Sequence, residues 1–416
     1  MMAERLLARY AAVRRLTERL CEPLAVEDYV IQAMADVSPA KWHLAHVSWF
    51  FETFVLRRVL SAYRPLDEGY AVLFNSYYNG VGPQFSRPAR GHLSRPTVAE
   101  VYAYRAHVDK AMLTLLDGGL PLDESIAAVI ELGVQHEQQH QELLVTDLKF
   151  NLSVNPLRPA YGARADLAAG VTAPRPLSRV PFDGGTTEVG HDGAEFSFDN
   201  ERPRHRVMLA PYLLASRLIS NGEYLEFIGD GGYARPELWL SDGWRSVQER
   251  QWRAPLYWQR SDGGDWWTYT LGGVDRVAPA APVSHVSYYE ADAFARWCGA
   301  RLPTEMEWEH AVRDEQAAGT LLDEMPREPQ PASADGLAQM TGDAWEWTAS
   351  AYASYPGFRP LDGALGEYNG KFMVNQMVLR GGSCATPRSH IRPTYRNFFP
   401  PDARWQFSGI RLAYDR

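Results

Sequence analysis

The sequence lacks the features that would place this protein in several large classes. It has only 3 cysteines in 416 residues, too few and too scattered for a disulfide framework, so we expect a reducing, cytoplasmic location. Its formal net charge is -9, so it lacks the basic excess that binding to a nucleic-acid backbone requires. The N-terminal stretch alternates charged and apolar side chains without a long apolar run, unlike a signal peptide or membrane span. These absences favour a protein that acts on small molecules and binds neither nucleic acid nor membrane.

The length and composition predict a globular protein with two domains. Hydrophobic residues make up 45% of the chain and charged residues 22%, which is enough apolar material for a large core. Residues 1–154 have the periodicity of four amphipathic helices and predict a four-helix metal-binding bundle. The second helix is expected to have Ser38 as its cap and Pro39 as its first residue, the third to begin at Thr97, and the fourth near Asp123.

Two further segments complete the expected organisation. The connection between the second and third helices, residues 63–96, is rich in Gly, Pro, Tyr and Arg, and a loop of that length is usually functional. Residues 155–180 have the Pro- and Ala-rich composition of a linker. Residues 181–416 contain short apolar runs, many Gly and Trp residues and few helical patches, which predicts an α+β domain.

The motif HEQQHQE, residues 136–142, has two interpretations: HExxH, the pattern of a zinc protease, and HxxxHxE, which would supply two ligands of an iron site for oxidative chemistry. As HExxH it matches a zinc-protease helix, in which two histidines one turn apart bind the metal and the intervening glutamate activates water. The third ligand of such proteases is missing, because the positions expected for Gly and His hold Leu143 and Thr146, and no Glu occurs between Glu142 and Glu188. The sequence therefore lacks the third metal ligand of both zinc-protease classes, the downstream His of one and the downstream Glu of the other.

A third ligand can come from the second helix, where WHLAH places His43 and His46 three residues apart. Glu142 lies about 200° around the helix from His140 and cannot easily bind the same ion, so we expect a supporting role. Three neutral imidazoles leave coordination positions open on a divalent metal, which suits an anionic soft ligand such as a thiolate beside O2. The motif does not choose between iron and zinc.

Several motifs together resemble one family. In the first domain they are WHLAH, FNSYYNGVGPQFSRPARG and HEQQHQE, and in the second VSYYEADAFARWCGARLPTEMEWEHA, GDAWEWTASAY, VLRGGSCATPRSHIRPTYRNFFP and FSGIRLA. The chain resembles the iron-dependent sulfoxide synthases of ergothioneine biosynthesis and their relatives, the selenoneine synthases. This resemblance implies a DinB-like four-helix bundle followed by a domain like formylglycine-generating enzymes, with a C-type-lectin-like fold.

The resemblance also implies a metal site and a reaction. The expected Fe(II) ligands are His46, His136 and His140, which leaves His43 as a structural residue. The implied reaction is O2-dependent: it joins the sulfur of cysteine or γ-glutamylcysteine to the imidazole C2 of hercynine, the trimethylated betaine of histidine, and gives a sulfoxide.

Substrate contacts follow by the same resemblance. Gln139 is expected to contact the hercynine imidazole, and the segment Asn397, Phe398 and Phe399 to contact its quaternary ammonium, which aromatic faces attract. Tyr77 or Tyr78 is the expected proton or hydrogen donor near O2, with Tyr78 preferred, and tyrosines at this place are typical of the cysteine-using branch.

Arginines are the expected partners of the sulfur donor's carboxylate. Arg87 and Arg90 are the first choice, and further candidates are Arg392, Arg396 and Arg404. The resemblance makes the remaining motif residues scaffold: Arg301, Glu305, Trp308, Trp345, Glu346, Trp347 and Arg380. Cys384 lacks the second cysteine used by formylglycine-generating enzymes, which disfavours aldehyde formation on sulfatases.

Two alternatives stay open. A selenoneine synthase would join a selenosugar to hercynine with the same iron site and hercynine pocket. A non-catalytic ligand-binding module is the alternative from another class, because both expected folds also occur without redox chemistry.

Overall fold

A computed structural model describes the chain except residues 1, 118–122, 163–172, 313–318, 324 and 326, so part of the expected linker lies outside the described residues. The chain forms two compact units. The first contains residues 1–161 together with Leu361–Tyr368, and the second contains residues 162–360 and 369–416. None of the helices in the described part of the chain is long and apolar enough to span a bilayer.

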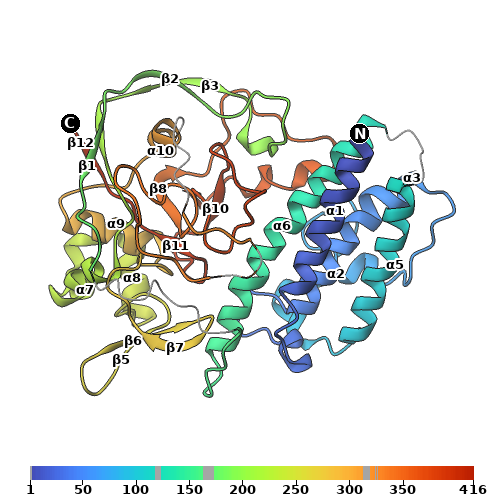
Figure 1. Ribbon diagram of the computed structural model, residues 1–416, viewed down its shortest axis with the longest axis horizontal. Coiled ribbons are helices and arrows are strands. Elements are labelled where there is room, and N and C mark those ends of the chain that lie inside the picture. The colour runs from blue at the N-terminus through green and yellow to red at the C-terminus, as the bar shows by residue number, and fades with distance from the viewer. Residues whose placement is uncertain (1, 118–122, 163–172, 313–318, 324, 326) are drawn as a thin grey trace. The chain divides into compact units, whose positions relative to one another are not determined.

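The first unit is a helical bundle built on four long helices (Figure 1). Helix α1 contacts α5 and α6, and α2 contacts the same two helices, so the four close around a common core. The π-helical turn that follows α2 and the short α3 extend that helix without a break. The helices are α1 (Met2–Arg19), α2 (Ala40–Phe51), α3 (Arg57–Val59), α4 (Tyr70–Leu73), α5 (Val98–Asp117) and α6 (Glu124–Ser153), and the π-helical turn is Glu52–Leu56.

Local capping explains where two of the helices begin. Thr97 and Glu100 exchange the hydrogen bonds of a capping box at the start of α5. The Asp123 side chain accepts from the amide of Ser125 at 2.7 Å and caps α6. Both helix starts agree with the sequence prediction.

The predicted start of the second helix is wrong by one residue. The first residue of α2 is Ala40, and Pro39 is its N-cap with extended backbone and no side-chain cap. Ser38 does not cap the helix, because its hydroxyl accepts a hydrogen bond from Arg90 at 2.9 Å and its amide donates to Asp147 at 2.8 Å. Ser38 therefore forms tertiary hydrogen bonds in place of the helix cap that the local pattern predicted.

Helices α2 and α6 approach closely at Gly133. A Cβ at this position would lie 2.5 Å from Cε1 of Phe51 and 2.9 Å from Cε1 of Phe50, closer than side-chain packing allows. Gly133 lies one turn before His136, so the missing side chain lets α2 come close to α6 where the histidines lie.

A short segment from late in the sequence belongs to the helical unit. Residues Leu361–Tyr368 include the 3-10 helix η7 (Gly363–Glu367). The Glu367 carboxylate accepts hydrogen bonds from the amides of Asn79 and Gly80, at 3.1 and 2.7 Å. This contact fixes the segment to the turn that follows Tyr77 and Tyr78.

The second unit consists of small sheets and short helices joined by long irregular segments. A four-stranded sheet has the order β10-β9-β8-β11, two three-stranded sheets have the orders β1-β4-β12 and β5-β6-β7, and β2 pairs with β3. The strands are β1 (Arg179–Phe182), β2 (Gly185–Val189), β3 (His205–Leu209), β4 (Tyr212–Ala215), β5 (Trp258–Arg260), β6 (Trp266–Thr270), β7 (Gly273–Arg276), β8 (Trp345–Ala351), β9 (Met377–Arg380), β10 (Asn397–Phe399), β11 (Ser408–Gly409) and β12 (Ala413–Asp415). The helices are α7 (Asn221–Gly229), α8 (Ser241–Glu249), α9 (Tyr288–Trp297) and α10 (Glu305–Val312).

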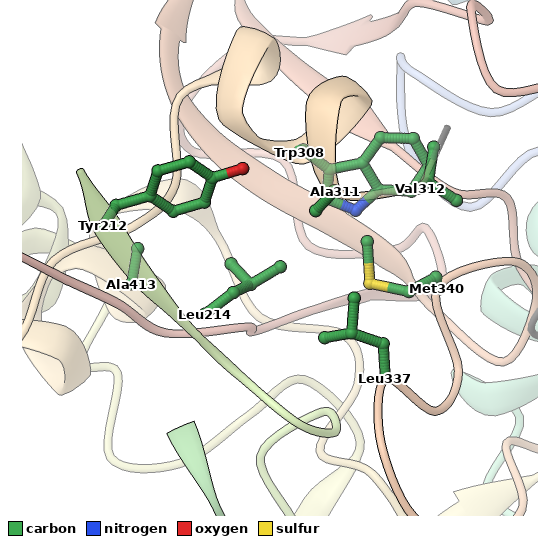
Figure 2. Packing of buried hydrophobic residues seen from close by; sticks show 8 residues of the cluster. All are labelled: Tyr212, Leu214, Trp308, Ala311, Val312, Leu337, Met340 and Ala413. Carbon is green, nitrogen blue, oxygen red and sulfur yellow. The ribbon is translucent and has the colours of Figure 1, made fainter. Parts of the chain in front are cut away.

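A buried cluster joins helix α10 to the sheet that contains β4. Figure 2 shows Trp308 and its helical neighbours on one side and the side chains of β4 and β12 on the other. The members are Tyr212, Leu214, Trp308, Ala311, Val312, Leu337, Met340 and Ala413. Trp308 also donates its indole N–H to Glu346 at 2.8 Å, so this motif tryptophan has the scaffold position expected of it.

Candidate metal centre

Three buried histidines of the helical unit converge. His46 comes from α2, and His136 and His140 lie four residues apart on one face of α6. One ring nitrogen from each lies within 4.8 Å of the other two, and the side chains are only 0%, 1% and 8% exposed. Among the described residues this is the one group with the composition and spacing of a metal site.

Surrounding groups fix the ring of His46. Its Nδ1–H donates to the carbonyl of Phe74 at 2.6 Å, which leaves Nε2 with its lone pair available for a metal. Trp42 and Trp49 stack on the ring, with centroid distances of 4.5 and 5.5 Å. Phe74 belongs to the long connection before α5, so that connection contributes directly to the site.

The converging histidine nitrogens are close enough to share one cation. Nε2 of His46 lies 3.3 Å from Nε2 of His136, and within the described part of the chain the buried Nδ1 of His136 has no hydrogen-bond partner. Burial lowers the pKa of His136 to about 3. Burial, and then the neighbouring histidines, also lower the pKa of His46 and of His140 well below the usual value. Neutral imidazoles that face one another at this distance fit a divalent metal ion.

Glu137 faces away from this group. Its carboxylate accepts hydrogen bonds from Arg105 at 2.7 Å, Arg14 at 3.0 Å and the hydroxyl of Thr17 at 2.7 Å, all in the bundle interior. Burial would raise the pKa of Glu137, but Arg105 and Arg14 outweigh burial and lower it to about 2. A carboxylate held in this way cannot act as the general base of a zinc protease. Glu142 is buried but does not belong to the histidine group.

Three tyrosines lie near the histidines. Tyr78 is fully buried, stacks on Tyr77 at 4.8 Å and contacts Trp49 at 5.6 Å, and Trp49 in turn stacks on His46. Tyr368, from the late segment Leu361–Tyr368, contacts the ring of His136 directly, with centroids 5.5 Å apart. Sequence reasoning missed Tyr368, because nothing in the local pattern shows that its segment joins the helical unit.

Arg90 has the character of an anion site. It is 3% exposed, donates to the hydroxyls of Ser38 and Ser76, and lies 3.4 Å above the ring of Trp42. It forms no salt bridge with any carboxylate in the described part of the chain. Burial, and then the charge of Arg87, lower the pKa of Arg90. An anionic ligand would neutralise this buried charge.

The other predicted contacts are more exposed. Arg87 is exposed and donates to the carbonyl of Asp36. Gln139 is half-buried on α6, immediately before His140.

The predicted ammonium-binding segment forms strand β10 of the second unit. Phe398 stacks on Tyr352 with centroids 3.9 Å apart, and Phe399 packs edge-on against Trp405 at 5.7 Å. Asn397 accepts a hydrogen bond from the amide of Phe398. All three side chains are half-buried, so the rings of Phe398 and Phe399 are only partly covered.

Unlike Arg90, the three further candidate arginines form salt bridges within the protein. Arg392, Arg396 and Arg404 bind the buried carboxylates of Glu201, Glu305 and Glu290, in that order. Their charges are neutralised within the protein, which leaves Arg90 as the better candidate for a substrate carboxylate.

Comparison with known proteins defines first a domain combination and then a family. Residues 9–144 match the DinB superfamily, and residues 169–328 and 320–416 match the sulfatase-modifying factor enzyme 1-like domain. The chain is therefore a DinB-like four-helix bundle followed by a formylglycine-generating-enzyme-like domain. The formylglycine-generating enzyme of Bos taurus is 26% identical and matches 63% of this chain and 84% of its own length.

More extensive relatives contain both parts. The hercynine oxygenase of Mycobacterium tuberculosis is 34% identical over 407 residues, which is 91% of each chain. The hercynine oxygenase of Mycolicibacterium smegmatis is 35% identical over 410 residues, again 91% of each chain. This protein belongs to the sulfoxide synthase family of ergothioneine biosynthesis.

Proposed function

We propose that this protein is an Fe(II)-dependent sulfoxide synthase that joins the sulfur of cysteine or γ-glutamylcysteine to the imidazole C2 of hercynine. The observation that carries the proposal is the buried group of His46, His136 and His140, in a chain similar to hercynine oxygenases over 91% of its length. The three imidazoles bring no charge and occupy one side of an ion, so positions remain for a thiolate and for O2.

The proposed reaction balances with O2 as the oxidant. Hercynine C2 and the thiol each lose one hydrogen as the C–S bond forms, the sulfur gains one oxygen atom, and the other oxygen leaves as water. The bound iron would supply the means to reduce O2 by four electrons. The protein has to hold the two organic substrates side by side and exclude water.

Arg90 is the residue proposed to hold the donor's carboxylate. Its buried charge pairs with no carboxylate among the described residues, and its guanidinium lies over the ring of Trp42, which stacks on His46. An anion bound to Arg90 would therefore lie close to the metal ligands. Arg87 is the second proposed contact, and it would also attract the substrate's negative charge.

Hercynine is proposed to contact Gln139 through its imidazole. For its trimethylammonium group the family resemblance points to Asn397, Phe398 and Phe399. Phe398 and Phe399 are aromatic and half-buried, which suits attraction of a quaternary cation.

A tyrosine is proposed to deliver a proton or hydrogen atom beside O2. Tyr77 and Tyr78 are the family-based candidates, and Tyr368 is the candidate favoured by its direct ring contact with His136. Burial, and then Tyr77, raise the pKa of Tyr78, so its hydroxyl keeps its proton at neutral pH. The family resemblance assigns a tyrosine from the C-terminal domain to the γ-glutamylcysteine-using branch. Because Tyr368 comes from the C-terminal part of the chain, the tyrosines do not distinguish cysteine from γ-glutamylcysteine.

The test is product analysis with each donor in turn. Enzyme loaded anaerobically with Fe(II) receives hercynine and O2 together with cysteine, γ-glutamylcysteine or a selenosugar. We expect oxygen uptake and a sulfoxide whose mass is hercynine plus donor plus one oxygen, less two hydrogens. Preferred turnover of the selenosugar would identify a selenoneine synthase instead. Iron-loaded protein that takes up no oxygen and forms no C–S or C–Se product would overturn the proposal.

A further inference from the structure

His43, the first histidine of WHLAH, lies between a proposed metal ligand and a carboxylate. Its Nδ1 is 2.9 Å from Nδ1 of His140, and its Nε2 is 3.1 Å from Oδ2 of Asp147. His43 and Asp147 are each 3% exposed, so water does not compete for these hydrogen bonds. Asp147 lies seven residues after His140 on α6, on nearly the same helix face.

The two contacts of His43 allow only one polarity if His140 binds a metal. Two ring nitrogens 2.9 Å apart form a hydrogen bond only when one carries a proton and the other a lone pair. With Nε2 of His140 on the metal, its Nδ1 carries the proton and donates to Nδ1 of His43. His43 then carries its own proton on Nε2 and donates it to Asp147, whose carboxylate only accepts.

The opposite polarity would disable the ligand. A proton on Nδ1 of His43 would place the lone pair of His140 on Nδ1 and its proton on Nε2, the nitrogen that has to bind the metal. When the His43 ring is neutral, the Asp147 carboxylate prevents this arrangement, because it requires the single ring proton of His43 at Nε2.

Asp147 is itself fixed by the start of α2. The same oxygen, Oδ2, accepts from the amide of Ser38 at 2.8 Å, two residues before α2 begins. The carboxylate therefore connects α6, which carries His136 and His140, to the beginning of the helix that carries His43 and His46.

We propose that Asp147 and His43 are positioning residues that fix the tautomer and ring orientation of His140 for metal binding. This inference rests on the proposed metal site and gives His43 a role that the family resemblance did not. Outer hydrogen bonds of this kind generally change metal affinity by about 10- to 100-fold. Neither residue needs to contact substrate or metal.

Two substitutions of His43 separate positioning from packing. His43→Leu fills the space but removes both hydrogen bonds. His43→Asn can place its amide oxygen near the former Nδ1, where it accepts from His140 but does not reach Asp147. His107→Asn is a matched control in the same unit, because the His107 ring bonds the carbonyl of Arg64 and packs against Tyr63, outside the histidine group.

The readouts are the Fe(II) dissociation constant, measured anaerobically by competition with a chelator, and the absorption spectrum of the Co(II)-loaded protein. We expect roughly 10- to 100-fold weaker Fe(II) binding and an altered Co(II) spectrum for His43→Leu. His43→Asn should recover part of both, and His107→Asn should match the unsubstituted protein. Asp147→Asn tests the same series of hydrogen bonds while keeping the His43 ring, and it should also weaken Fe(II) binding.

The outcomes separate this inference from the proposed function. Failure of the unsubstituted protein to bind Fe(II) or Co(II) would refute the metal site itself. A protein that binds metal normally in all the His43 and Asp147 variants would refute the positioning role alone. If His43→Leu does not fold, an unchanged Fe(II) constant in folded His43→Asn and Asp147→Asn would still overturn it.

Discussion

The two units neutralise their buried polar groups in different ways. In the second unit five buried carboxylates each pair with an arginine: Glu201–Arg392, Glu290–Arg404, Glu305–Arg396, Glu309–Arg380 and Glu346–Arg411. In the helical unit Glu137 follows the same rule with Arg14 and Arg105. The three histidines differ, because they are neutral and one ring nitrogen of each converges on the other two. We interpret the buried Arg–Glu pairs as structural. The converging ring nitrogens of the three histidines are the candidates for metal binding.

Removal of a converging histidine should have the largest effect on function. We expect His140→Ala to lose iron almost completely, because two imidazoles hold a divalent ion far more weakly than three. Iron content per folded chain after anaerobic loading and desalting measures this. His107→Ala should retain the full amount, and stoichiometric iron in His140→Ala would contradict the ligand assignment.

Removal of the tyrosine proposed to donate beside O2 should leave iron in place but slow the reaction. Loss of a general acid costs roughly 10²- to 10⁴-fold in rate, so one of Tyr78→Phe and Tyr368→Phe should slow sulfoxide formation by that order. The product should also shift toward simple oxidation of the thiol. Comparing both variants with Tyr77→Phe identifies the donor, and the same product ratio in all three would exclude a tyrosine from this role.

Breaking an internal pair of the second unit should affect stability rather than metal binding. Arg411 is fully buried, bonds Glu346 at 2.8 Å and donates to the carbonyls of Ala215 and Ala338. We expect Arg411→Met to cost about 3–5 kcal/mol of unfolding free energy, because it leaves Glu346 buried without its partner. Chemical denaturation followed by tryptophan fluorescence measures this. Weaker Fe(II) binding by the folded variant, with no change in stability, would reverse the assignment of roles.

The smallest effect is expected at the close approach of α2 and α6. Gly133→Ala would force Phe50 and Phe51 to move and should cost about 1–3 kcal/mol. It should also weaken Fe(II) binding, because His46 and His136 come from the two helices that separate. Gly229→Ala, at a position with nothing within 4 Å, is the matched control and should change neither quantity.

Local sequence patterns were sufficient for the elements that depend on neighbouring residues. The capping box of Thr97 and Glu100, the Asp123 cap and the one-turn spacing of His136 and His140 are properties of single helices, and the structure contains all of them. The DinB-like and formylglycine-generating-enzyme-like folds were likewise recognisable from motifs.

Contacts between distant segments could not be predicted in this way. Ser38 has the residue type of a helix cap, but Arg90 and Asp147 from elsewhere in the unit take its hydrogen-bonding groups. Tyr368 lies 232 positions after the histidine that it contacts, and no periodicity links them. The hydrogen bonds of His43 likewise depend on how α2 packs on α6.

The three-histidine iron site can be tested by locating the metal in crystals of the iron-loaded protein. Diffraction data collected on both sides of the iron absorption edge give an anomalous difference map. We expect one strong peak per chain, at coordination distance from His46, His136 and His140. A peak at any other place, or none in protein shown to carry one iron per chain, would contradict it.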